Sequence, residues 1–278
     1  MKFSDNIFYR GLYFSLPVKE ESLLRKMFVA LLKGNKNILI DCGVSYHFPD
    51  IVQLAAEADL KLSDIDIVII THCHADHTGG LFKLKQENPN IKIWTHPLCK
   101  PMIENIDEQF KIRPVPAFYH LMGGSVKVDR EIEDGEEIDI GYLVKIIYTP
   151  GHSNDSISLC LPDEKMIISG DAIPYINDMP IYEDLNALKA SLEKMKKYEC
   201  DYIISAFSGL WDNNSQGNIF TVTEKHLQTI QSAVDDFQRD FPNSPLEEMG
   251  SFVLKRINNN SFPVPIFLTS LKEHIKQK

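Results

Sequence analysis

The chain has 278 residues, of which 44% are hydrophobic and 24% are charged, a composition typical of a soluble globular protein with a sizeable core. Its formal net charge of −10 argues against a broad nucleic-acid surface, because such a surface needs clustered Lys and Arg. No run is long and apolar enough to predict a membrane-spanning helix. The first residues lack an apolar signal core, and five scattered cysteines favour free thiols, so we expect a cytoplasmic protein.

Residues 1–212 are rich in β-forming segments. Met27–Leu32 and Asn37–Asp41 flank turn-forming residues and predict a hairpin, and Phe48–Ala58 has apolar residues at helical spacing. Six further segments are predicted to be strands: Ile65–Ile70, Ile91–Thr95, Leu143–Thr149, Ser156–Leu161, Lys165–Ser169 and Asp201–Ser205. Leu185–Tyr198 carries one apolar stripe at helical spacing, which predicts a helix that faces the core.

Residues 213–278 have a different pattern, with no strongly β-forming segment. Thr221–Glu224 fits a capping box ahead of a helix, and Pro245 is expected at the first position of a second helix. Val264–Ile275 predicts a third helix. We therefore expect a body followed by a small helical C-terminal extension.

The most informative run lies between Thr71 and Gly80, where three imidazoles and one carboxylate fall within six positions. His72, His74, Asp76 and His77 are side chains of the types that bind divalent transition metals. Packing alone explains them poorly, because unpaired polar groups are costly to bury. The run directly follows a predicted buried strand, which can hold ligands in a fixed geometry.

Two more segments place ligand-type side chains at strand ends. His152 follows a Pro-Gly turn after one strand, and Asp171 follows a glycine after another. Each is weak evidence alone, but a zinc site needs imidazoles and carboxylates from several strand ends, with one position open to water. The combination predicts a metal site, with zinc expected and iron or manganese possible.

In this order and spacing, the residues resemble the metallo-β-lactamase superfamily. The resemblance rests on Asp41 after an apolar strand, the run His72–His77, His152 in Thr-Pro-Gly-His and Asp171 in Ser-Gly-Asp. It covers roughly Phe8–Gly209. It implies an α+β fold, a four-layer αββα sandwich with the metal site at one edge of the two sheets.

The resemblance also implies roles for these residues. It implies two sets of ligands that share a bridging carboxylate: His72, His74 and His152 for one ion, Asp76 and His77 for a second, and Asp171 for both. Asp41 would support the ligand loop without binding metal. One or two zinc ions are therefore expected.

This chain departs from the family at the last ligand, a histidine that normally follows the strand corresponding here to Tyr202–Ser205. Phe207 or Ser208 stands in that position, and neither is a good metal ligand. Three outcomes are open: a weak second metal, a single metal, or a replacement ligand from elsewhere. The candidate replacements are His47, His96, His120 and Asp212.

The resemblance implies a hydrolase in which a metal-activated water cleaves an ester, thioester or lactone of a small molecule. Asp76 is the candidate catalytic residue, able to orient the water or move a proton. One alternative is a mononuclear non-haem iron oxygenase similar to the persulfide dioxygenases, with iron on His72, His152 and Asp171. Another is a metal-binding module with little activity.

Candidate substrate contacts come from two loops. Tyr46 and His47 follow Asp41, whereas Tyr119 and His120 belong to an aromatic, proline-rich segment that forms either a pocket wall or a surface loop packed on itself.

No basic cluster suited to a glutathione carboxylate or a phosphate stands out. We expect a small-molecule substrate and no nucleic-acid or membrane partner, and a homodimer is one candidate assembly. His226 and His274, on the helical extension, are predicted to be ordinary surface residues.

Overall fold

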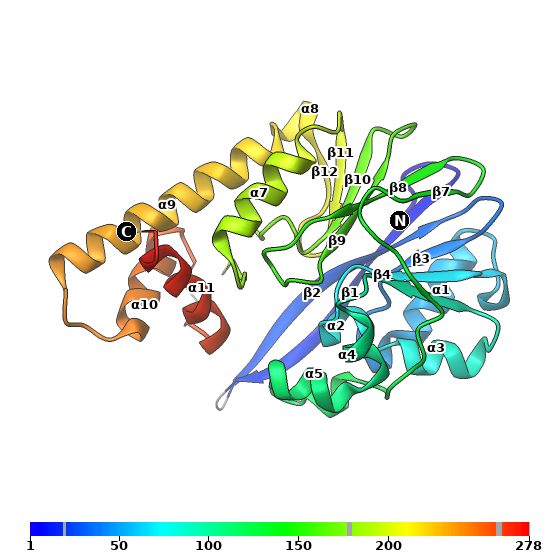
Figure 1. Ribbon diagram of the computed structural model, residues 1–278, viewed down its shortest axis with the longest axis horizontal. Coiled ribbons are helices and arrows are strands. Elements are labelled where there is room, and N and C mark those ends of the chain that lie inside the picture. The colour runs from blue at the N-terminus through cyan, green and yellow to red at the C-terminus, as the bar shows by residue number, and fades with distance from the viewer. Residues whose placement is uncertain (19–20, 177–179, 260–262, 278) are drawn as a thin grey trace.

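The structure is a computed structural model that describes residues 1–18, 21–176, 180–259 and 263–277. It contains two six-stranded sheets that stack face to face, with helices on both outer faces (Figure 1). This arrangement confirms the predicted α+β sandwich of four αββα layers. None of the described helices is long and apolar enough to cross a membrane.

The first sheet has the strand order β1-β2-β3-β4-β5-β6. Its strands are β1 (Ile7–Val18), β2 (Glu21–Leu32), β3 (Ile38–Ile40), β4 (Ile67–Ile70), β5 (Lys92–Thr95) and β6 (Arg130–Glu131). Strands β1, β2 and β3 pair antiparallel, and β3 to β6 pair in parallel. The predicted pairing of the β2 and β3 segments is confirmed, but β2 is longer than expected and pairs along its whole length with β1, which the sequence analysis missed.

The second sheet has the order β12-β11-β10-β9-β8-β7. Its strands are β7 (Glu137–Asp139), β8 (Leu143–Tyr148), β9 (Ile157–Leu161), β10 (Met166–Gly170), β11 (Tyr202–Ser205) and β12 (Gly209–Asp212). All neighbours pair antiparallel except β10 and β11, which are parallel.

Alternate side chains along a strand face different layers of the sandwich. In β4, Ile67 and Ile69 face the core between the sheets, and Val68 and Ile70 face the outer helices. Successive residues of a strand point to opposite faces, so a strand buried on both sides reads as a continuous apolar run. This explains why β4 is uniformly hydrophobic and fully buried.

Several short helices and α1 cover the first sheet (Figure 1). They are α1 (Phe48–Glu57), α2 (Ala75–Thr78), α3 (Leu81–Glu87), α4 (Lys100–Glu104), α5 (Ile106–Ile112) and α6 (Phe118–Leu121). The second sheet is covered by α7 (Leu185–Met195) and the first turns of α9 (Ile219–Asp240), whose Phe220 and Leu227 share one hydrophobic cluster with α7.

The C-terminal part is helical, as predicted. After the short α8 (Asn213–Gln216), α9 packs with α10 (Leu246–Arg256) and α11 (Pro265–Ile275) around a separate apolar cluster. Two predicted boundaries are wrong. Helix α9 begins at Ile219, because the side chain of Asn218 accepts a hydrogen bond from the Thr221 amide at 3.1 Å, and Pro245 precedes α10 as its N-cap instead of occupying its first position.

Candidate metal centre

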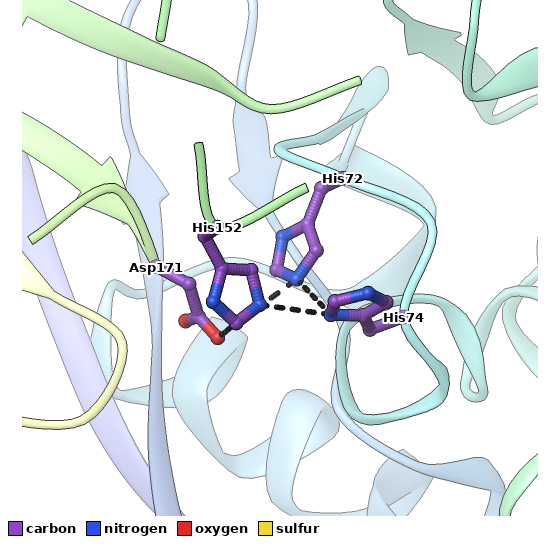
Figure 2. A group of neighbouring side chains, drawn as sticks. All are labelled: His72, His74, His152 and Asp171. Carbon is purple, nitrogen blue, oxygen red and sulfur yellow. Dashed lines mark hydrogen bonds and ion pairs between the residues drawn. The ribbon is translucent and has the colours of Figure 1, made fainter. Parts of the chain in front are cut away.

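Ligand-type side chains from three strand ends meet at one edge of the sandwich (Figure 2). His72 and His74 follow β4, His152 follows β8, and Asp171 follows β10. One potential ligand atom from each of these buried residues lies within 4.8 Å of the others. The structure thus brings together the three segments that the sequence analysis expected to meet.

Three imidazole nitrogens form the centre of this cluster. His74 Nδ1 lies 2.8 Å from His72 Nε2 and 2.9 Å from His152 Nε2. Asp171 Oδ2 lies 3.1 Å from His152 Nε2 and 3.8 Å from His72 Nε2. We call these four residues the ligand cluster.

The second nitrogen of two of these rings has a hydrogen-bond acceptor. His152 Nδ1 donates to the backbone carbonyl of Ile181 at 2.7 Å, and His72 Nδ1 lies 3.2 Å from Thr71 Oγ1, whose own proton goes to Asp41. An imidazole that donates through Nδ1 presents a bare lone pair at Nε2. These contacts therefore fix the tautomer in which both rings offer Nε2 to the centre.

The electrostatics favour neutral imidazoles and an ionised carboxylate. Burial lowers the pKa of His72 and His74 well below the usual value, and the neighbouring cation Arg113 adds to this effect. Burial also lowers the pKa of His152, although Asp171 opposes it. For Asp171, burial raises the pKa but His152 and His77 outweigh it, so the net pKa is lowered. Deprotonated ligands are what metal binding requires.

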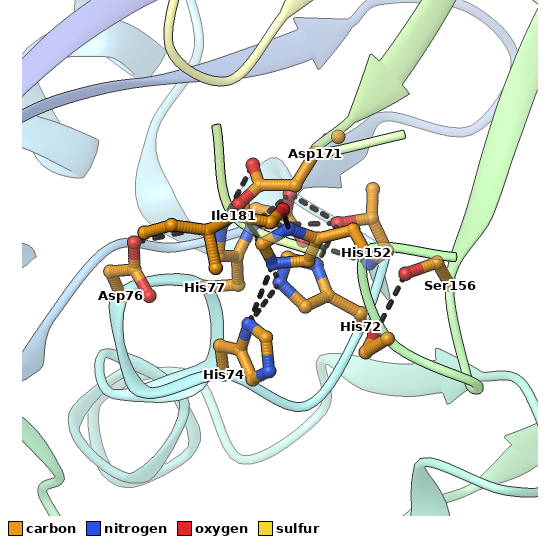
Figure 3. A network of polar contacts seen from close by, with 12 residues as sticks. His72, His74, Asp76, His77, His152, Ser156, Asp171 and Ile181 are labelled. Atoms are coloured by element: carbon orange, nitrogen blue, oxygen red, sulfur yellow. Dashed lines mark hydrogen bonds and ion pairs between the residues drawn. The ribbon is translucent and has the colours of Figure 1, made fainter. Parts of the chain in front are cut away.

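A second group of atoms adjoins the ligand cluster on the side of His77 (Figure 3). His77 Nε2 lies 3.4 Å from Asp171 Oδ1 and 3.8 Å from Asp76 Oδ2. Both His77 Nε2 and Asp171 Oδ1 are buried without a hydrogen-bond partner among the described residues. Buried polar atoms without a hydrogen bond are costly in a native protein, and a bound cation would satisfy both. These residues therefore fit the metal that the resemblance implies.

Asp41, at the end of β3, is hydrogen-bonded to the loop that carries His72, His74 and His77. Its carboxylate accepts hydrogen bonds from the Thr71 amide and hydroxyl, both at 2.8 Å, and from His77 Nδ1 at 2.7 Å. Its φ of 59° is left-handed, a conformation that Asp adopts more readily than most residues. Asp41, Asp171 and Asp76 outweigh the burial of His77 and raise the pKa of that imidazole well above its usual value. Asp41 thus occupies the supporting place that the resemblance implied.

The segment that orients His152 is itself held by the C-terminal helices. Tyr182 is next to Ile181. Its backbone amide donates to Ser270 Oγ at 2.9 Å, and its backbone carbonyl accepts from the same hydroxyl at 3.0 Å. The Tyr182 hydroxyl also contacts His274 Nε2, and His274 Nδ1 donates to Gln231 Oε1 at 2.7 Å. Helices α9 and α11 are therefore connected to a ring of the ligand cluster through hydrogen bonds.

This network corrects the prediction that His226 and His274 are surface residues. They are 8% and 1% exposed. Burial, with smaller effects from Lys189 and His226 that outweigh Asp235, lowers the pKa of His274 to about 4. Burial also lowers the pKa of His226. The sequence alone gave no sign of this, because the partners of His274 lie on distant segments.

Beside the ligand cluster, the surface forms a hollow of about 850 Å³, counting the space open to solvent. His74, Asp76, His152 and Asp171 lie in its wall. Much of the remaining lining is apolar and includes Phe14, Leu16, Val115, Phe118, Ile173 and Ile266. A concave, mostly apolar site with a few convergent polar groups is the usual form of a small-molecule pocket.

Phe207 lines this hollow at the place where a last histidine was expected. Its ring lies under the guanidinium of Arg25, with Arg25 Cζ 5.0 Å from the ring centroid. Ser208 instead donates its amide to Ser205 Oγ at 3.0 Å. Of the proposed replacement ligands, none belongs to the ligand cluster among the described residues.

The four predicted substrate contacts do not line the hollow. His47 is buried, accepting from the Val44 amide through Nδ1 and contacting the Tyr13 carbonyl through Nε2 at 2.9 Å. Tyr46 is exposed and lies against His120, with ring centroids 5.6 Å apart. Tyr119 is exposed and donates to Asp107 at 2.9 Å. The aromatic segment does contribute Phe118 and Leu121 to the wall.

The sequence analysis missed two arginines that reach this hollow. Arg25 lies on β2 and Arg113 follows α5, so no basic cluster is visible along the chain, yet the fold brings both to one pocket. Arg113 Nη1 lies 2.6 Å from His74 Nε2. The only signal of Arg113 in the sequence is a lone arginine at the end of a helix, which usually has no special role.

Comparison with known proteins identifies relatives of this chain. A "Beta-lactamase-like protein 2 homolog" from Caenorhabditis elegans is 31% identical over 59% of this chain and 49% of its own length. An atrochrysone carboxyl ACP thioesterase from Cryptosporiopsis is 27% identical over 67% of this chain and 49% of its own length. The chain thus spans about half the length of these relatives.

A crystal structure of a beta-lactamase domain protein from Burkholderia ambifaria has the same fold, with a TM-score of 0.70, 15% identity, and coverage of 100% of this chain and 86% of that chain. The family description that matches residues 27–206 is the metallo-beta-lactamase superfamily. That match spans more than half of the chain and contains every residue of the ligand cluster. This protein therefore belongs to the metallo-beta-lactamase superfamily.

Proposed function

We propose that this protein is a metal-dependent hydrolase that cleaves an ester, thioester or lactone bond of a small molecule. The proposal rests on one observation: the ligand cluster lies in the wall of a largely apolar hollow. A metal held there would face the space in which an acyl group can bind. Neither a purely structural metal site nor a simple pocket needs both features together.

The residues divide into a strong and a weak metal position. His72, His74, His152 and Asp171 would hold one ion, and His77 and Asp76 would hold a second with Asp171 between them. Because Phe207 provides no ligand, we expect the first position to bind more tightly. Zinc suits a set of neutral imidazoles and one carboxylate.

A bound divalent metal supplies Lewis acidity, which makes hydroxide available near neutral pH and polarises a carbonyl group. Asp76 reaches the hollow and is positioned to take a proton from the attacking water. The water oxygen bonds to the carbonyl carbon, the C–O or C–S bond breaks, and the proton passes to the leaving alkoxide or thiolate. The apolar wall would hold the acyl chain while this happens.

The name of the Cryptosporiopsis relative, a thioesterase, supports a thioester among the three bond types. Five free cysteines support a reducing compartment, in keeping with a cytoplasmic enzyme. The acidic net charge supports a small-molecule substrate over a nucleic acid. A homodimer remains a prediction.

The test is turnover by protein stripped with a chelator and then titrated with zinc, manganese or iron(II), using a panel of esters, thioesters and lactones. We expect hydrolysis that rises with occupancy of the first site and is absent in His152→Ala. Full occupancy without hydrolysis of any panel member contradicts the proposal and supports a metal-binding module. Oxygen consumption by the iron form with a persulfide would contradict it in favour of an oxygenase.

A further inference from the structure

Two arginines stand in the wall of the hollow, in a chain whose net charge is −10. Apart from Asp76 and Asp171, which adjoin the metal site, the lining contains no carboxylate among the described residues. A buried cation such as Arg113 is costly unless it is paired, and apolar side chains cannot pair it. The hollow therefore presents guanidinium groups where the substrate would lie, in a chain whose overall charge is negative.

Arg113 has few partners for a group with five N–H donors. Its side chain is 18% exposed, and Nη1 lies 2.6 Å from His74 Nε2 and 3.8 Å from Glu183 Oε1. These are its only hydrogen bond and ion pair among the described residues. Its planar guanidinium is suited to pair with two oxygens of one carboxylate or phosphate.

The contact with His74 cannot persist when that ring binds a metal through Nδ1, the atom that faces His72 and His152. A neutral imidazole that gives its Nδ1 lone pair to a metal carries its proton on Nε2 and becomes a donor there. Arg113 has no acceptor atom, so two donors would face each other. With a metal bound, the guanidinium would lose its hydrogen bond to His74 and could donate to another acceptor in or beside the hollow.

We propose that Arg113 binds an anionic group of the substrate, a carboxylate or a phosphate, next to the metal site. The inference rests on the proposed function and makes it more specific: the substrate is an acyl compound with an apolar part and an anionic end. Arg25, which lies over Phe207, adds positive potential to the same wall. The alternative is that Arg113 is structural and serves mainly to pair with Glu183.

The experiment compares two thioesters of N-acetylcysteamine that differ in one terminal group. The succinyl thioester ends in a carboxylate, and the butyryl thioester ends in a methyl group. Wild type, Arg113→Gln and Lys111→Gln are assayed in the zinc-loaded form. Lys111 is the matched control, because it lies on the same helix but is exposed and pairs only with Glu108.

We expect Arg113→Gln to lower kcat/KM for the succinyl thioester by about 10- to 100-fold, mainly through KM, because a hydrogen bond to a charged group is lost. The butyryl thioester should change by less than about threefold, and Lys111→Gln should resemble wild type for both. An equal loss for the two thioesters would overturn the proposal, since it would show a general structural role. An unchanged kcat/KM for both thioesters would also overturn the proposal.

A binding measurement separates this inference from the proposed function. Succinate, inorganic phosphate and neutral succinamide are titrated calorimetrically into zinc-loaded protein. Tighter binding of succinate or phosphate that is lost in Arg113→Gln supports the inference even if no thioester is cleaved, and the stronger of the two anions identifies the group. Anion binding that is the same in the variant contradicts it, because the metal alone would then account for the affinity.

Discussion

The ligand cluster and the hollow beside it are built from different kinds of segment. The cluster draws on residues that directly follow strands, and its rings are fixed by hydrogen bonds such as that from His152 Nδ1 to Ile181. The hollow takes apolar side chains from places as far apart as Phe14 on β1 and Ile266 on α11. A rigid set of ligands can therefore stay constant while the wall, and with it the choice of substrate, changes.

Phe207 is the residue at which the two regions meet. It occupies the position of an expected ligand but contributes a ring to the wall of the hollow. At this position the chain has apolar surface where the resemblance implies a metal ligand. Changes in the cluster should therefore affect metal binding first, whereas changes in the wall should affect substrate selection.

The largest effect is expected for Asp171→Asn, because this carboxylate contacts both His152 and His77. Loss of its charge should lower metal affinity and hydrolysis by more than about 100-fold, beyond the usual cost of a residue that only orients a ligand. Affinity is measured by competition with a chelator. Asp201→Asn, which alters an exposed ion pair with Lys165, is the control. If Asp171→Asn bound metal as tightly as the wild type, Asp171 would not be a metal ligand.

Asp41→Asn should have the next largest effect. Asn tolerates the left-handed backbone at this position, but its NH₂ group cannot replace a carboxylate oxygen that accepts from Thr71 and His77. We expect metal affinity to fall about 10- to 100-fold, as for other residues that orient a ligand. An unchanged affinity with a lower melting temperature would show that Asp41 only stabilises the loop.

Acid should destabilise the C-terminal helices through His274. Its pKa of about 4 in the folded protein lies below the ordinary value near 6.5, so the unfolded chain takes up the proton first. The corresponding stability is present above pH 6.5 and is lost as the pH falls towards 4, by up to about 3 kcal/mol. Urea unfolding of metal-free wild type and His274→Asn across this range measures the difference. Parallel curves for the two proteins would contradict this assignment.

The smallest effect is expected for Ser270→Ala, which tests the connection between α11 and the ligand cluster. Removal of the hydroxyl frees the Tyr182 backbone, so the carbonyl of Ile181 should orient His152 less firmly. We expect metal affinity to fall by less than about tenfold. Ser251→Ala is the control, because that hydroxyl donates only within α10. Equal affinity in both variants would limit the role of α11 to packing.

The ligand cluster could be predicted from the sequence because its chemistry is local. Three histidines and an aspartate fall within six positions after one strand, and His152 and Asp171 each follow another strand. Several of the strands could also be predicted, since strands buried on both faces give unbroken apolar runs, whereas the four layers were implied by the family resemblance.

The hollow could not be predicted, because its residues have no shared local signal. Arg113 looks like a cation at the end of a helix, and Ile266 looks like a core residue of α11. Their meeting depends on tertiary packing between segments far apart in the chain. For the same reason, Tyr46 and Tyr119 were reasonable candidates in sequence but lie outside the hollow.

The most direct test of the account is the metal content of protein purified without added metal, compared between wild type and His72→Ala. Circular dichroism confirms that both are folded. The account predicts about one equivalent of a divalent metal per chain in the wild type, and little in the variant, which lacks one of three converging imidazoles. Equal metal content in the two proteins would contradict it.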